Sequence, residues 1–296
     1  MKFKIKPLSL CLFLFLMLLT GCGTTAKSNS TSKTDASPET TTIPEAITVT
    51  SATTSETIQP EPLLVLPLTT NDSGKVMIQT VSKSTGYPFN SYIITSIGGE
   101  TIVVDPTQMP SKDVIDLNPA AIISTHAHGD HVDIAFSDSY DCPKIMYTKE
   151  DITTRDFHIY TIWSQHNETP LAENSGNVIV VFEVDGLRIA HMGDIGQTEI
   201  TEQQLEELGK IDIAFMQLEN SFSNMNIINE KGFILLEQFN PTIVIPTHYT
   251  FKAFPKIEKR YGKTVTEFEN VFAISKDELP DTPLNFYHIT NTHKYN

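Results

Sequence analysis

The chain has few cysteines and few basic residues, and each shortage excludes a class of protein. Three cysteines occur in 296 residues, and two of them, Cys11 and Cys22, lie at the N-terminal end. Cys142 is then left without a partner, which excludes a disulfide framework. Lysine and arginine total 21 against 36 acidic residues, giving a formal net charge of −15. Because nucleic-acid binding needs concentrated basic side chains, we expect no nucleic acid among the partners.

Apolar runs are short, and the longest, Leu8–Leu19, is too short to span a bilayer as a stable helix. Three lysines precede it, so the pattern predicts an export signal over residues 1–21. The signal ends in Leu19-Thr20-Gly21-Cys22, which resembles the bacterial lipoprotein cleavage box. The resemblance implies that Cys22 is the first mature residue and carries lipid such as palmitate. We therefore expect a protein anchored at the extracytoplasmic face of the cell membrane. An ordinary secretory signal and an uncleaved anchor are the alternatives.

The stretch that follows Cys22 is poor in large apolar residues. Serine, threonine, proline and alanine dominate it up to about Pro62, and such a composition does not fold alone. We predict that residues 22–62 form a disordered tether and that residues 63–296 form one folded domain, which is long enough to bury a large core.

Within 63–296, short β-rich runs alternate with helical patterns, which predicts an α/β fold with two sheets face to face and helices outside. The expected strands are Lys75–Val81, Ser91–Ile97, Thr101–Asp105, Ala120–Ser124, Lys144–Tyr147, His158–Trp163, Asn177–Val184, Leu187–His191, Ile211–Leu218 and Pro241–Ile245. The expected helices are a short one over Lys112–Leu117, one from about Asp130, and those over Thr201–Leu208 and Asn229–Phe239.

A dense cluster of metal-ligand side chains follows the expected strand Ala120–Ser124. His126, His128, Asp130 and His131 lie within six residues. Neutral imidazole and carboxylate are the ligands that a borderline cation such as zinc prefers. A tight loop directly after a strand can direct these side chains toward one point. A polar loop whose histidines face water is the alternative. Surface loops, however, are usually built from serine, asparagine, glycine and aspartate.

Two further polar residues lie at the ends of later strands. Asp194 follows the strand Leu187–His191, and His248 follows Pro241–Ile245. Sites in layered α/β folds assemble in the loops beyond the carboxyl ends of strands. We therefore expect both residues to converge with the histidine loop, although each alone is also compatible with ordinary turn chemistry.

The run His-x-His-x-Asp-His, the later Gly193-Asp194 and the later Pro246-Thr247-His248-Tyr249 resemble the metallo-β-lactamase fold superfamily over about Lys75 to Phe254. The phrases around Asp194 and His248 are similar to the branch that contains the ascorbate-phosphate lactonase and the N-acylphosphatidylethanolamine phospholipase D. The resemblance implies an αββα four-layer sandwich with two divalent metal ions, Zn²⁺ first and Mn²⁺ as an alternative. It also implies that His126, His128 and a third histidine bind one ion. Asp130, His131 and His248 would bind the other, and Asp194 would bridge the two.

Two residues compete for the place of the third histidine. His191 lies only three residues before Asp194, roughly 10 Å along an extended strand, so both reach one metal pair only if the chain folds back sharply. His166 follows the strand His158–Trp163 and leaves room for the intervening hairpin, so we favour His166. His191 shares a strand face with apolar residues, and its alternative role is a buried histidine that orients a neighbour.

Paired divalent ions lower the pKa of water and polarise a carbonyl or phosphoryl oxygen, so hydrolysis is the expected chemistry. The resemblance implies a metal-bridged hydroxide as the nucleophile, which Asp130 and Asp194 hold. The substrate would be a small-molecule ester, lactone or phosphodiester. Tyr249 and His191 are the candidates for the acid that assists the leaving group.

Two segments depart from that branch or stand apart from its motifs. Glu219–Met225 stands where the branch tends to have a glycine-rich turn, which predicts a different wall for the substrate. The polar stretch Asp151–Gly176 is compatible with a lid, and Thr153–Arg155 within it with an anion contact or an ordinary surface loop.

Two rival functions use the same residues. In one, a non-catalytic surface lipoprotein binds metal or a ligand with this site. In the other, iron in the same ligands performs redox chemistry together with a flavin domain, and no such domain is evident in this sequence. The physiological substrate, the native metal and the oligomeric state do not follow from the sequence.

Overall fold

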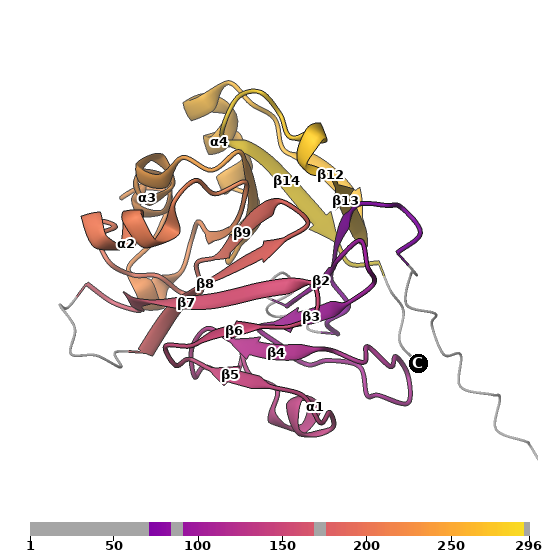
Figure 1. Ribbon diagram of the computed structural model, residues 1–296. Coiled ribbons are helices and arrows are strands. Elements are labelled where there is room, and N and C mark those ends of the chain that lie inside the picture. The colour runs from indigo at the N-terminus through magenta and orange to yellow at the C-terminus, as the bar shows by residue number, and fades with distance from the viewer. Residues whose placement is uncertain (1–70, 84–90, 169–175, 293–296) are drawn as a thin grey trace, which may run out of the picture. The chain divides into compact units, whose positions relative to one another are not determined.

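Short runs rich in β-branched and aromatic residues form most of the regular structure of this chain. The computed structural model describes residues 71–83, 91–168 and 176–292, which all belong to one unit of the chain, Pro60–Asn296 (Figure 1). The predicted signal peptide, the lipidated Cys22 and the tether lie outside the described residues. Within the described part, no helix combines the length and the apolar character needed to cross a membrane.

The strands form two sheets. The first has the order β13-β1-β2-β3-β4-β5, and its strands are Val271–Ile274, Val76–Gln79, Tyr92–Thr95, Thr101–Val104, Ala121–Ser124 and Lys144–Met146. The second has the order β12-β14-β11-β10-β9-β8-β7-β6, and its strands are Thr266–Glu269, Asn285–Thr290, Ile243–Thr247, Ile213–Gln217, Leu187–His191, Gly176–Val184, Phe157–Gln165 and Asp151–Thr153. The helices are α1 Ile134–Asp138, α2 Glu202–Leu208, α3 Lys231–Phe239 and α4 Ala253–Tyr261, with 3₁₀ turns η1 Ser221–Ser223 and η2 Lys276–Glu278.

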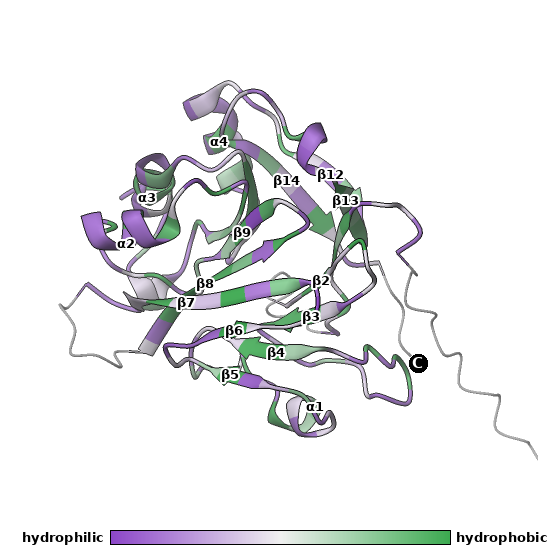
Figure 2. Cartoon of the chain, viewed as in Figure 1, coloured by the Kyte–Doolittle hydropathy of each residue, from purple (hydrophilic) through white to green (hydrophobic). Residues whose placement is uncertain are grey.

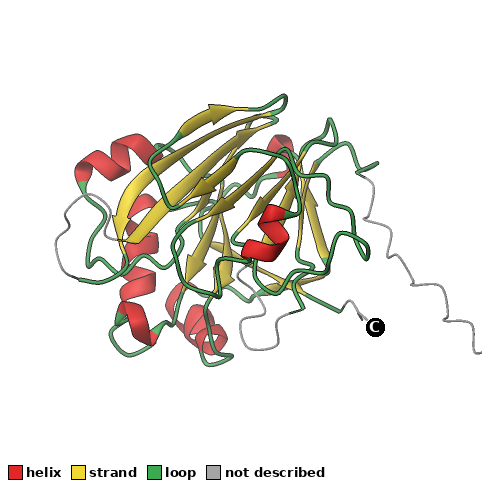
Figure 3. Cartoon of the chain, turned by 90° about the horizontal axis from the view of Figure 1, so that it is seen from below, coloured by secondary structure: helices red, strands yellow, loops and turns green. Residues whose placement is uncertain are grey.

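Three apolar clusters show how the layers stack. The largest lies between the sheets and joins residues such as Ile94 and Ile123 of the first to Val180 and Phe215 of the second. A second cluster packs the other face of the second sheet against α2, α3 and α4, and a third packs the outer face of the first sheet against α1. Figure 2 shows apolar residues along the strands and polar residues on α2, and Figure 3 shows the strands between the helices. The arrangement is the predicted αββα sandwich.

Strand direction brings several loops to one edge of the sandwich. β9, β10 and β11 are parallel neighbours, so the loops after His191, Gln217 and Thr247 begin at the same edge of the second sheet. β7 runs antiparallel to β8, which runs antiparallel to β9, so the loop after Gln165 begins there as well. In the first sheet β3 and β4 are parallel, which places the loops after Val104 and Ser124 together.

Two predicted helices differ from the structure. Residues 112–117 form no helix but a turn in which Val114 and Ile115 both donate to the carbonyl of Ser111. The backbone N–H of Leu117 donates to the Tyr140 hydroxyl at 3.2 Å instead of to a helical carbonyl. The helix expected from about Asp130 is α1, which begins at Ile134 because the Asp133 side chain accepts from the N–H of Phe136 and caps the helix there.

Several elements were not expected from the sequence. Helix α4 and strands β12, β13 and β14 follow the last predicted strand, and the three strands complete both sheets at their edges. The stretch Asp151–Gly176, for which a lid was one interpretation, forms sheet in its described part, because β6 and β7 lie in it and pair with each other, and β7 pairs with β8. Residues 169–175 of that stretch lie outside the described residues. The guanidinium of Arg155 pairs with the carboxylate of Asp156, which favours the surface segment over the anion contact for Thr153–Arg155.

Candidate metal centre

The loop after β4 holds its histidines through a buried carboxylate. Thr125 donates to Asp105 from its backbone N–H at 2.7 Å and from its hydroxyl at 2.8 Å. The N–H of His131 donates to the carbonyl of His128 at 2.9 Å, which closes the loop into a tight turn. Short hydrogen bonds within and beneath the loop therefore fix the directions of its imidazoles.

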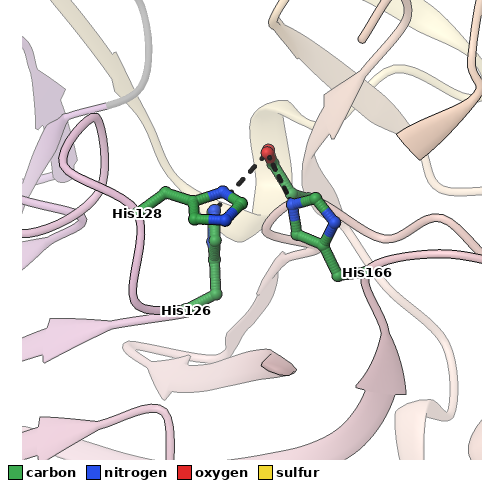
Figure 4. A group of neighbouring side chains, drawn as sticks. His126, His128 and His166 are labelled. Atoms are coloured by element: carbon green, nitrogen blue, oxygen red, sulfur yellow. Dashed lines mark ion pairs between the residues drawn. The ribbon is translucent and has the colours of Figure 1, made fainter. Parts of the chain in front are cut away.

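A first ligand group consists of His126, His128, His166 and Asp194, each of which offers one ligand atom within 4.8 Å of the others. Nε2 of His126 and Nε2 of His166 each lie 3.4 Å from Oδ2 of Asp194. Figure 4 shows the three histidines directed toward a common point, with His166 approaching from the opposite side to the histidine loop. Of the two candidates for the third histidine, the structure brings His166 into this group.

A second ligand group consists of Asp130, His131, Asp194 and His248, whose ligand atoms also lie within 4.8 Å of one another. Nε2 of His248 lies 3.1 Å from Oδ1 of Asp194 and 3.4 Å from Oδ2 of Asp130. His248 has a positive φ of 32°, and its carbonyl accepts from the N–H groups of Leu218 and Glu219. Such a sparsely populated backbone conformation is held by its surroundings and is common at functional sites.

Asp194 belongs to both groups, and its two oxygens divide between them. Oδ2 faces His126 and His166, whereas Oδ1 faces His131 and His248. Burial raises the pKa of this carboxyl, but the four surrounding imidazoles bring it well below its usual range. Asp194 is therefore a buried carboxylate that stays ionised between two sets of imidazoles, which is the geometry of a bridging ligand.

Asp105 is a functional residue that the sequence analysis did not identify. It is fully buried, and its Oδ2 lies 2.7 Å from Nδ1 of His131. A metal-binding histidine usually bonds its second nitrogen to such a carboxylate, which fixes the orientation of the ring. Burial lowers the pKa of His131, but Asp105 and Asp194 outweigh it and raise that pKa to about 10. Asp105 and Asp194 together therefore favour a positive charge at the position of His131.

Two glycines flank Asp194 where the chain approaches other backbone and side chains closely. Gly193 has a φ of +56°, and a Cβ there would lie 2.3 Å from the Asn177 side chain. A Cβ on Gly196 would lie 1.9 Å from the carbonyl oxygen of His166, so another residue would push the His166 loop away. The Asn177 amide oxygen also accepts from the N–H of Asp194 at 2.9 Å. This packing sets the position of Asp194 relative to His166.

The segment Glu219–Met225, singled out in the sequence as a departure, lies directly against the site. The amide of Asn220 donates to Oδ2 of Asp194 at 2.7 Å and to Gln217 at 2.9 Å. The ring of Phe222 lies 6.5 Å from that of His128, centroid to centroid. The contact with Asp194 was not predicted, because an asparagine in a polar loop carries no distinctive signal.

The buried side chain of Lys231 joins three loops around the first ligand group. Its Nζ donates to the carbonyl of Gly196 at 2.7 Å and to that of Ser223 at 2.6 Å. The same atom lies 3.1 Å from the carboxylate of Glu168, two residues after His166. One ammonium group thus links the loops that carry His166, Asp194 and Asn220.

The two residues considered for the general acid have other contacts. His191 is fully buried outside both ligand groups. Its Nδ1 accepts from the N–H of Gly193 at 3.1 Å, and its ring stacks on Phe215. The structure thus gives His191 its alternative role, that of a buried histidine beside the site. The hydroxyl of Tyr249 lies 2.5 Å from Nε2 of His288. Cys142 is a free, partly buried thiol, and the other two cysteines lie outside the described residues.

Three polar atoms at the centre of the site fit a metal ion. Nε2 of His126, Nε2 of His166 and Oδ1 of Asp194 are buried and make no hydrogen bond within the described residues. Buried polar atoms nearly always have a hydrogen-bond partner, so three such atoms together need another ligand. Imidazole nitrogen and carboxylate oxygen are donors that divalent zinc and manganese accept. The donor set therefore suits divalent cations.

Comparisons with known proteins point to one family. A family model described as the β-lactamase superfamily domain matches residues 85–248, more than half of the chain. A UPF0173 metal-dependent hydrolase from Natranaerobius thermophilus is 24% identical over 202 residues, which cover 59% of this chain and 87% of the relative. A metal-dependent hydrolase of the same group from Thermus thermophilus is 26% identical over 206 residues, covering 58% and 85%.

Solved structures share the fold. A metallo-β-lactamase superfamily protein from Thermotoga maritima has a TM-score of 0.54 at 18% identity, with 73% of this chain and all of that chain covered. A metallo hydrolase from the archaeon Ignicoccus hospitalis has a TM-score of 0.50 at 14% identity, with 68% and 97% covered.

Proposed function

This chain belongs to the β-lactamase superfamily and is one of its metal-dependent hydrolases, and from that premise we propose that it hydrolyses a small ester, lactone or phosphodiester with two divalent metal ions. The observation that carries the proposal is the division of the Asp194 carboxylate between two sets of imidazoles. A single ion would need only one of those sets, so the arrangement supports a dinuclear centre.

The first ligand group would hold one ion and the second ligand group the other, with Asp194 shared. We propose Zn²⁺ as the native metal, with Mn²⁺ as the alternative. When bound, such a pair supplies Lewis acidity, lowers the pKa of water and polarises a carbonyl or phosphoryl oxygen.

The protein residues have separate roles in this proposal. Asp105 accepts a hydrogen bond from the Nδ1–H of His131 and so directs Nε2 of that ring into the site. The hydroxyl of Thr125 lies 3.2 Å from Nδ1 of His126 and orients that ring in the same way. Asp130 is partly exposed, whereas Asp194 is buried. Asp130 is therefore the carboxylate that can orient an attacking water molecule and take its proton.

The loops after β4, β7 and β11 carry the more exposed imidazoles of the site. His128 is exposed, and His166 and His248 are partly exposed, whereas His126 and His131 are buried. The substrate would therefore approach from the side of His128, His166 and His248. The buried rings set the floor of the site and exclude water from beneath it.

The test is metal content together with turnover on a panel of chromogenic esters, lactones and bis-nitrophenyl phosphate. We expect two zinc equivalents per chain and hydrolysis of at least one class. Asp130→Ala is expected to lower kcat at least about 100-fold while the far-ultraviolet circular dichroism is unchanged. Tight metal binding without turnover on any member would favour the non-catalytic binding protein. Full activity in metal-loaded Asp130→Ala protein would contradict the role given to that carboxylate.

We also propose that the chain is a lipoprotein, anchored through Cys22 at the extracytoplasmic face of the cell membrane. The support is the sequence alone, namely the apolar run that ends in Leu19-Thr20-Gly21-Cys22. Detergent-phase partitioning and mass spectrometry of the N-terminal peptide test it against the Cys22→Ser variant. Wild-type protein is expected in the detergent phase with an acylated Cys22. An unmodified cysteine on a mature chain would contradict the anchor.

A further inference from the structure

The most exposed large apolar side chains of the described residues gather on two loops at the site edge. Ile228, Phe222 and Phe251 are 89%, 77% and 70% exposed, and every other exposed large apolar residue in the described ranges is below 60%. Phe222 and Ile228 lie between β10 and α3, and Phe251 lies between β11 and α4. Phe222 has a ring contact with His128 of the first ligand group, and an exposed apolar side chain beside a site indicates a contact with a ligand.

Phe222 stands on the open side of the first ligand group. Its ring lies 6.5 Å from that of His128, with the planes inclined at 60°. His128 is exposed, whereas His126 and Asp194 of the same group are buried. A molecule that reaches this group from solvent therefore comes within contact range of the Phe222 ring.

The loop that presents Phe222 is fixed to the metal-binding residues. Oδ1 of Asn220 accepts from the N–H of Phe222 at 3.0 Å, and the amide of the same asparagine donates to Asp194 at 2.7 Å. Lys231 holds the next carbonyl, that of Ser223. The backbone that carries the ring is thus held by the carboxylate at the centre of the site. A loop that is already ordered loses less conformational freedom when a ligand packs against its side chain.

The neighbouring loop is tied to the same segment. Oε2 of Glu219 accepts from the N–H of Thr250 at 2.7 Å and from its hydroxyl at 2.6 Å. The loop with the exposed ring of Phe251 therefore shares its support with that of Phe222. The segment Glu219–Met225 contains no lysine or arginine, so it offers an apolar ring and no cation to a ligand.

We propose that Phe222 is a specificity-determining residue that packs against an alkyl or aryl group of the substrate beside the first ligand group. The inference rests on the proposed function, because it places the scissile bond at the metal centre. It deepens that function by assigning an apolar, uncharged group to the part of the substrate next to His128.

The test measures binding, so it does not depend on turnover. Isothermal titration of the zinc-loaded full chain is carried out with acetohydroxamate, octanohydroxamate and benzohydroxamate, which share one metal-binding head. We expect wild-type protein to bind the octanoyl and benzoyl compounds about tenfold more tightly than the acetyl compound, since each buried methylene adds affinity. In Phe222→Ala this preference is expected to fall to about twofold, with acetohydroxamate affinity and zinc content unchanged. Phe222→Leu should retain most of the preference for the octanoyl compound.

Ile97→Ala is the matched control. Ile97 is 44% exposed in the β2–β3 turn, where its N–H donates to Asp185 of the β8–β9 turn, at the opposite edge of the sandwich. Its removal should leave the preference at the wild-type value.

Other results would overturn the inference. These are equal wild-type affinity for all three compounds, an equal loss for all three in Phe222→Ala, or an unchanged preference in that variant. In the last case, a change in sedimentation or in binding to phosphatidylglycerol vesicles in Phe222→Ala would identify the face as a contact with a second copy or with a membrane.

A wild-type chain without zinc would remove the proposed function and this inference together. A chain that binds zinc and shows the chain-length preference but hydrolyses nothing would remove the hydrolase proposal alone.

Discussion

The two ligand groups share Asp194 but are supported in different ways. The second group stands on the core, because the buried carboxylate of Asp105 holds both its His131 and the histidine loop. The first group takes His126 and His128 from the same loop, but its third histidine, His166, follows β7 in a loop that Lys231 holds through Glu168. The difference teaches that Asp105 supports both groups through the histidine loop and bonds directly to a ligand only in the second, whereas the link through Lys231 reaches the centre through His166.

The largest effect is expected where the two groups meet. Asp194→Asn removes the charge that both groups share, while the amide keeps the size of the side chain. We expect both metal equivalents to bind weakly and kcat/KM to fall about 1,000-fold or more, since the groups act as a unit. Elemental analysis after gel filtration and initial-rate kinetics measure the two effects. A variant that keeps two tight equivalents would show that Asp194 does not join the groups.

A larger effect on the second group than on the first is expected from Asp105→Asn. The variant leaves His131 without its carboxylate partner, and losses of this kind cost about 10- to 100-fold in metal affinity. Competition with a chromogenic chelator should show the second equivalent weakened more than the first, because Asp105 bonds directly to His131 and reaches His126 only through Thr125. Asp156→Asn is the control, because that carboxylate bonds to Ser96 and Arg155 at the opposite edge. Equal weakening of both equivalents would contradict this difference in support.

A selective effect on the first group is expected from Lys231→Met. Methionine keeps the apolar length but leaves the carbonyls of Gly196 and Ser223 without their donor, so we expect a loss of about 3 kcal/mol in the free energy of unfolding. The looser His166 loop should also weaken the first equivalent. Lys256→Met is the matched control. That lysine pairs with Glu230 in a partly exposed bridge, where the cost should stay below about 1 kcal/mol.

Urea denaturation of the zinc-free proteins measures the stability term, and the chelator competition measures the metal term. Equal effects of Lys231→Met and Lys256→Met on the free energy of unfolding and on metal affinity would show that the contacts of Lys231 with the three loops do not support the first ligand group.

The smallest effect is expected from Tyr249→Phe. The hydroxyl of Tyr249 faces Nε2 of His288, so its loss should lower kcat by less than about threefold and leave both metal equivalents in place. The pH profile of kcat is the measurement. A loss of more than about 100-fold, with the alkaline limb of the profile removed, would identify Tyr249 as the general acid.

Much of this centre could be predicted from the sequence, because its ligands lie at strand ends. The density of histidines after β4 is distinctive, and the order of Asp194 and His248 after later strands added two more positions. His166 followed from the room that its distance to Asp194 leaves for the hairpin. The apolar runs likewise predicted most strands of the two sheets and therefore the layers.

The parts that escaped prediction depend on tertiary contacts. Asp105 at the end of β3 looks like an ordinary turn residue until His131, 26 residues later, is placed against it. Residues 112–117 have a helical composition, yet Ile115 and Leu117 pack into the outer cluster of the first sheet instead. β12 and β14 pair in parallel in the second sheet. β13 lies between them in the sequence but belongs to the first sheet. Local patterns do not encode such pairings.

The most direct test of the dinuclear centre is anomalous diffraction at the zinc absorption edge from crystals of the zinc-loaded protein. The account predicts two peaks about 3.5–4 Å apart, with Oδ2 of Asp194 toward the one beside His126 and Oδ1 toward the one beside His248. A single peak, or two peaks of which one lies remote from Asp194, would contradict it.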